Sequence, residues 1–181
     1  AASDVYKRQA LSDDILNAVF NGLSSFQQAE AQAIFTAQPY LSDAFLMGIV
    51  NSSSQQQDQL MKKIYNHNAY LSDTVMIKMA EASNFSQNVL KDVLLTQGQM
   101  SQDVLLAIAS ELNSNADFAV EALLLNQPIL TDTIFYEVAE NSTLSNNVVF
   151  AIFSSAQSYP SDNALISLLN RTPAISERSL V

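Results

Sequence analysis

The chain has 181 residues, of which 48% are apolar and only 14% charged, and its formal net charge is −10. That length can bury one ordinary hydrophobic core. The acidic balance predicts no binding to nucleic acid and none to anionic membranes, because like charges repel. The chain has no cysteine, which excludes disulfides, thiolate zinc sites and cysteine nucleophiles. No apolar run approaches the roughly 18 residues of a membrane span, so we expect no transmembrane helix.

The first nine residues, Ala1 to Gln9, do not share the periodic pattern of the rest. Their string SDVYKRQ resembles translated sequencing-adapter sequence at the ends of metagenome-derived reading frames, which predicts a non-native segment. The alternative is a native, frayed tail. Under either interpretation the repeat array covers residues 10–181, and we expect it to be cut from a longer array that continues past Val181.

From Leu11 onward, six segments open alike, at intervals of 30, 30, 29, 30 and 30 residues. Each has Ser or Thr in second place, and apolar residues follow three, four, seven and eight residues later, as one stripe of an α-helix requires. Such a Ser or Thr caps a helix N-terminus. The Asp that follows it in five units is stabilised there by the helix dipole, by about 0.3–1 kcal/mol. These cap residues are Ser12, Asp13, Ser42, Asp43, Ser72, Asp73, Ser101, Thr131, Asp132, Ser161 and Asp162.

A second landmark follows in phase, as an apolar pair in the other half of each unit. Helices of about 10–12 residues are marginal alone in water, so each unit needs neighbours to cover its apolar faces. The predicted fold is therefore all-α, an α-solenoid of about six 30-residue helical hairpins. The pairs are Ile34-Phe35, Ile64-Tyr65, Val93-Leu94, Leu123-Leu124 and Ile152-Phe153.

The recurring Leu-Ser-Asp opening resembles short α-helical tandem repeats, about 15 or 30 residues long, in long proteins of environmental bacteria. The resemblance covers Ala10 to Val181, although the polar stretch Ser52 to Leu60 departs from its pattern. It implies a secreted or cell-surface protein and brings no catalytic residue, cofactor or known ligand.

The repeated Asp could also suggest a ladder of metal sites. Equivalent residues of stacked hairpins lie about 10 Å apart, whereas a calcium ion needs several oxygens within about 2.3–2.6 Å. We therefore predict no metal site, and the alternative is a weak acidic stripe that attracts divalent cations. His67 is the single histidine, which disfavours a zinc site or a catalytic triad, and we place it in a surface turn. Lys62 and Lys63 are expected on a solvated helix face, with Asp58 as an i,i+4 partner.

Tyr40, Tyr70 and Tyr159 each stand just before the Leu or Pro of an opening. The favoured interpretation is packing of the turn between units, as in a hydrophobic staple. The alternative is an interaction edge of aromatic side chains that grips a peptide or a glycan. Asn-x-Ser/Thr sequons also occur and matter only where the source glycosylates; they are at Asn51, Asn84, Asn141 and Asn170.

The pattern thus predicts no enzyme and no cofactor. The expected function is a structural spacer or protein-interaction segment of a larger extracellular or cell-surface protein. Its partners would be a protein or peptide and the neighbouring repeats of a longer chain. The alternative is an intracellular adaptor solenoid that binds a peptide.

Overall fold

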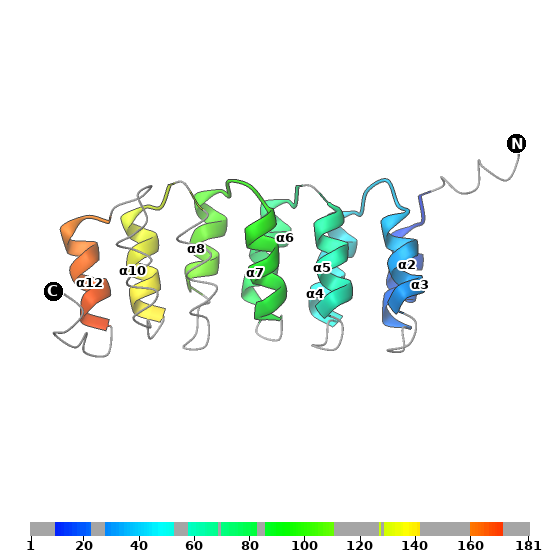
Figure 1. Cartoon of the computed structure of the whole chain (residues 1–181), viewed down its shortest axis with the longest axis horizontal. Coiled ribbons are helices and arrows are strands. Elements are labelled where there is room, and N and C mark those ends of the chain that lie inside the picture. The colour runs from blue at the N-terminus through cyan, green and yellow to red at the C-terminus, as the bar shows by residue number, and fades with distance from the viewer. Residues whose placement is uncertain are drawn as a thin grey trace, which may run out of the picture. The chain divides into compact units, whose positions relative to one another are not determined.

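The computed structural model describes residues 10–22, 28–52, 58–68, 70–82, 86–110, 127, 129–141 and 160–171. Within these ranges every regular element is an α-helix, so the all-α prediction is confirmed (Figure 1). The chain divides into two compact units, Ala1–Gln97 and Gly98–Val181.

The first unit is built from two layers of helices. One layer packs α2 on α4 and α4 on α6, and the other packs α3 on α5 and α5 on α7 (Figure 1). We call these the first and the second layer, because each hairpin gives its first helix to one and its second helix to the other. The bounds are α2 (Asp13–Asn21), α3 (Gln28–Thr36), α4 (Asp43–Ser52), α5 (Asp58–His67), α6 (Asp73–Glu81) and α7 (Gln87–Thr96).

In the second unit, α10 packs against both α8 and α12. These are the first helices of the fourth, fifth and sixth sequence repeats: α8 (Gln102–Ser110), α10 (Asp132–Asn141) and α12 (Asp162–Arg171). The predicted pairs Leu123-Leu124 and Ile152-Phe153 lie outside the described residues, as do Asn84 and Tyr159.

The apolar stripe forms the core as its spacing predicts. In α4, the residues three, four, seven and eight places after the capping Ser42 are at most 2% exposed. The same four positions are buried in α6, α8 and α10. A fully buried side chain of this size stabilises the fold by about 1.5–3 kcal/mol. The α4 residues are Phe45, Leu46, Ile49 and Val50.

Aromatic side chains join the two layers in the first unit. The Phe35 ring of α3 lies 6.4 Å from that of Phe20 and 5.4 Å from that of Phe45, centroid to centroid. Both distances are within the range in which aromatic pairs attract. On α5, the hydroxyl of Tyr65 donates a hydrogen bond of 3.0 Å to the carbonyl oxygen of Leu46, and burial raises the pKa of Tyr65 far above its ordinary value. The second layer is thus anchored to the first.

Four of the six predicted caps make the expected side-chain bond. The hydroxyls of Ser42, Ser72, Ser101 and Ser161 each accept a backbone N–H from the residue three places later, at 3.1–3.3 Å. Ser12 is the N-cap residue of α2 as predicted, but its side chain makes no capping bond. At Thr131 the backbone carbonyl accepts from the N–H of Ile134 at 3.0 Å.

Candidate functional site

An amide side chain near the end of each of the first four repeats bonds back to the start of that repeat, and Asn68, unlike the other three, is half-buried. The amide oxygen accepts the backbone N–H of the residue that opens the same repeat, at 2.9–3.3 Å. Gln38, Gln97 and Gln127 are buried, and Gln127 is only 2% exposed. We call these side chains the closing amides: Gln38 bonds to Leu11, Asn68 to Leu41, Gln97 to Leu71 and Gln127 to Met100.

The closing amides also donate. The NH₂ group of Gln38 bonds to the carbonyl of Ile34 at 3.2 Å, and that of Asn68 to the carbonyl of Ile64 at 3.1 Å. These residues were not predicted from the sequence. The signal was present, because an amide stands three residues before each of the five openings that follow the first.

Two of the recurring Asp residues, Asp13 and Asp132, link neighbouring repeats. The hydroxyl of Ser42 donates to Oδ2 of Asp13 at 2.6 Å while it caps α4. In the second unit, the N–H of Ser161 donates to Oδ1 of Asp132 at 3.0 Å. These two Asp residues therefore do more than complement the helix dipole, because each accepts a hydrogen bond from the cap of the following repeat.

The second layer has the same arrangement. The hydroxyl of Ser86, the residue before α7, donates to Oδ2 of Asp58, the first residue of α5, at 2.6 Å. In the first unit, one Asp–Ser hydrogen bond of this kind therefore joins neighbouring repeats within each layer. A charge-assisted bond of this length is among the stronger hydrogen bonds in proteins.

We expect the Asp132–Ser161 contact to show in acid titration. Hydrogen bonds from the side chain and the backbone of Ser161 lower the pKa of Asp132 below its ordinary value of 3.8. Because the folded-state pKa is depressed, the stabilisation is complete above the unfolded-state pKa and is lost as pH falls through the folded-state pKa. Ser161→Ala should move the pKa of Asp132 upward in a carboxyl NMR titration. Ser110→Ala, which removes an exposed hydroxyl of α8, should leave it unchanged; equal shifts in both variants would contradict the assignment.

A shallow polar groove of about 530 Å³ lies across the second layer of the first unit. Its side chains bond to one another across the helices. Lys63 donates to Oε1 of Gln32 at 2.7 Å, and Asn66 donates to Oδ2 of Asp92 at 2.9 Å. The lining residues are Gln32, Thr36, Gln59, Lys62, Lys63, Asn66, His67 and Asp92.

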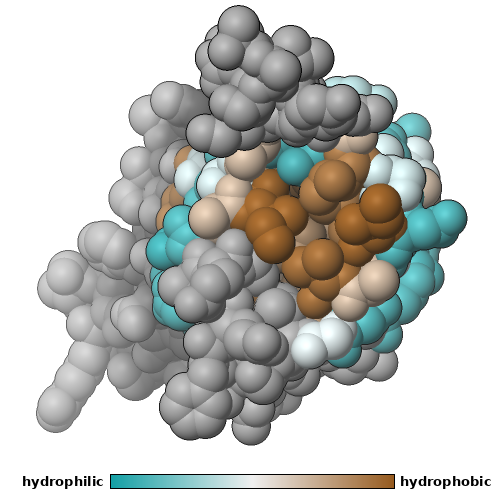
Figure 2. Space-filling view, turned by 90° about the vertical axis from the view of Figure 1, so that its right-hand side faces the viewer, coloured by the Kyte–Doolittle hydropathy of each residue, from teal (hydrophilic) through white to brown (hydrophobic). Residues whose placement is uncertain are grey.

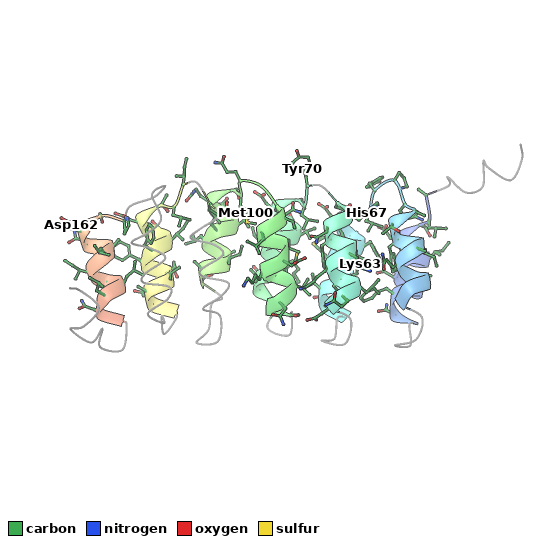
Figure 3. All side chains as sticks on the ribbon, in the orientation of Figure 1. Lys63, His67, Tyr70, Met100 and Asp162 are labelled. Carbon is green, nitrogen blue, oxygen red and sulfur yellow. The ribbon has the colours of Figure 1, made fainter. Side chains whose placement is uncertain are left out.

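Two expectations about this groove need correction. Nζ of Lys62 lies 3.9 Å from Oδ1 of Asp92 on α7, so its ionic partner is on the neighbouring helix and not Asp58. His67 is the last residue of α5 and is half-buried, not part of a surface turn (Figure 3). Its Nε2 donates to the carbonyl of Gln38 at 2.9 Å, which ties α5 to the end of the preceding repeat.

The tyrosines before the openings point outward. Tyr40 is 69% exposed and Tyr70 is 91% exposed, so the packing interpretation is wrong for both. Figure 3 shows Tyr70 in the loop before α6, directed away from the helices. Leu41 and Leu71, one residue closer to the cap, are buried instead. Tyr159 lies outside the described residues.

Over the part of the chain that the structure describes, no helix is long and apolar enough to cross a bilayer. The same residues contain no group of three or more His, Asp or Glu side chains that could hold a metal ion. No known protein family, curated protein or solved structure matches this chain.

Proposed function

We propose that the six 30-residue repeats form one α-solenoid and that this array is a non-enzymatic spacer or protein-interaction segment of a larger extracellular or cell-surface protein. The periodic openings support one array, because the spacing of the repeats is kept from Leu71 to Met100, across the boundary between the two compact units. The placement outside the cell follows from the resemblance of the Leu-Ser-Asp openings to repeats of secreted bacterial proteins.

The observation that carries this proposal is the use of the recurring polar residues. Among the described residues, Asp13 and Asp132 bond to the cap of the next repeat, and the closing amides bond to the residue that opens their own repeat. Several of the recurring polar residues therefore either close a hairpin or join it to its neighbour. An array of this kind acts by its length and by the surface that it displays.

A spacer lengthens in proportion to its repeats, which gives a direct test. A second copy of Leu41–Tyr70, inserted after Tyr70, adds 30 residues in register. We expect the maximum dimension from small-angle X-ray scattering to rise by about 10 Å, one helix-packing distance. A compact globule would grow by only about 2 Å for the same addition, so growth of that size would refute the solenoid.

The polar groove supports a second candidate, an intracellular adaptor that binds a peptide. Its amide and lysine side chains lie on α3 and α5, and Asp92 of α7 completes the lining, which gives donors and acceptors for the main chain of an extended peptide. Selection from a displayed random peptide library, repeated on Lys63→Glu, tests it. Peptides that bind the parent chain and not the variant would support the adaptor, and their absence would leave the spacer as the function.

A further inference from the structure

Two tyrosines of the first unit are exposed at equivalent places in the stack. Tyr40 lies in the connection from α3 to α4, and Tyr70 lies in the connection from α5 to α6, one repeat later. Their side chains are 69% and 91% exposed, while Leu41 and Leu71, one residue further on, fill the packing position. We call Tyr40 and Tyr70 the tyrosine edge. Aromatic side chains are enriched where proteins meet their partners, so a ring exposed at the same place in two successive repeats points to an interaction surface.

The tyrosine edge is distinct from the apolar surface at the α2 end of the first unit, which Figure 2 shows. That surface includes Ile15, and the residues equivalent to Ile15 in the next two repeats, Phe45 and Val75, are fully buried. It is therefore the kind of surface by which one repeat stacks on another. Tyr40 and Tyr70 remain exposed although α4 and α6, the helices that follow them, are packed in the stack. Stacking therefore does not cover these two rings.

The closing amides hold both tyrosine-bearing connections in place. The backbone N–H that follows Tyr40 donates to Oδ1 of Asn68 at 3.3 Å, and the one that follows Tyr70 donates to Oε1 of Gln97 at 3.0 Å. A binding group on a fixed loop loses less conformational freedom when a ligand arrives. The two rings are thus presented in a set arrangement, about 10 Å apart, which is one helix-packing distance.

A polyproline II helix matches this spacing. It rises about 3.1 Å per residue with three residues per turn, so equivalent residues recur about every 9.3 Å. Residues on one face of a β-strand recur about every 7 Å, which does not match. An α-helix is about 10–12 Å wide and docks in an apolar groove, whereas the Tyr70 ring, at 91% exposure, provides no groove wall.

The chemistry of the edge also suits a proline-rich segment. Proline-rich segments dock on aromatic side chains, and their conformation is formed before binding. The polyproline II backbone has no internal hydrogen bonds, so its carbonyls can accept from tyrosine hydroxyls. Asp43 and Asp73, three residues after each tyrosine, are exposed. Their carboxylates attract basic residues that flank the prolines.

We infer that the tyrosine edge binds a basic, proline-rich segment of a partner protein in the polyproline II conformation, with prolines three residues apart packed on Tyr40 and Tyr70. The inference rests on the proposed function, because it uses the regular stacking of the repeats and gives the protein-interaction role a class of partner. Both rings contact one ligand, so the loss of either ring weakens the whole contact.

Titration of the chain with a decaproline peptide flanked by lysines, followed by NMR, tests the inference. The resonances of Tyr40 and Tyr70 should shift together. Tyr40→Ala and Tyr70→Ala should each weaken binding on the order of tenfold, as truncation of an aromatic contact does at protein interfaces. The matched control is Tyr136→Ala, which removes a tyrosine of α10 that is 38% exposed and lies outside the edge. This variant should bind like the parent chain.

A glycine-serine peptide of the same length, with the same flanking lysines, should bind about tenfold more weakly or less, because it is a flexible coil without proline rings. Equal binding of the two peptides, or unchanged binding of Tyr40→Ala or Tyr70→Ala, would overturn the inference. So would shifts of both tyrosines with a soluble gluco-oligosaccharide and none with the proline peptide, since that result assigns the edge to glycans. A parent chain that binds no proline peptide, yet lengthens by about one helix-packing distance on insertion of a repeat, would overturn the inference and leave the proposed function intact.

Discussion

Phe45→Ala is expected to lower the free energy of unfolding by about 3–5 kcal/mol, because it removes a large side chain from a core that cannot close over the gap. Phe45 is fully buried and its ring stacks on that of Phe35 at 5.4 Å. It therefore supports both the contact between repeats and the contact between layers. Urea unfolding followed by circular dichroism measures the change.

Tyr70→Ala is the matched control for Phe45→Ala, since it deletes a ring of similar size from a side chain that is 91% exposed. We expect a change within about 0.5 kcal/mol, as for most surface substitutions. A loss at Tyr70 as large as that at Phe45 would restore the packing role that the exposure of this side chain contradicts.

Gln97→Leu is expected to cost about 1–3 kcal/mol, the penalty for a buried polar group left without its partner. The variant keeps a side chain of similar size but removes the oxygen that accepts the N–H of Leu71 at 3.0 Å. Both residues are buried, so water replaces that oxygen poorly. The loss should appear in chemical denaturation and as faster hydrogen exchange at the Leu71 amide.

Gln99→Leu controls for the general effect of exchanging glutamine for leucine, because Gln99 is exposed and only two residues away. It should leave both the stability and the exchange rate of Leu71 nearly unchanged. If Gln97→Leu behaves like Gln99→Leu, the closing amide contributes nothing and the hairpins are held by apolar packing alone.

The sequence predicted the features that depend on one helix at a time. The stripe after Ser42 identified Phe45, Leu46, Ile49 and Val50 as core, since helical spacing alone brings such residues to one face. The helix starts follow for the same reason, because a cap acts on its own first turn.

Features that join two helices were predicted poorly. The closing amide Gln38 acts on Leu11, 27 residues away, and only the folded hairpin brings the end of one helix to the start of the other. Lys62 was assigned to Asp58 by local spacing, but Asp92 on the next helix lies within reach. Tyr70 was misjudged because Leu71, one residue nearer the cap, already fills the packing position.

The closing amides also bear on how the chain folds. The bonds that define a hairpin and its link to the next join residues only 26 to 31 apart in the sequence. Such a pattern has a low contact order, which favours fast folding. Because one hairpin cannot bury its apolar face alone, folding can begin once a few consecutive repeats are available, and each later hairpin can then pack on them. The chain can therefore fold progressively from its N-terminal side while it is still being synthesised.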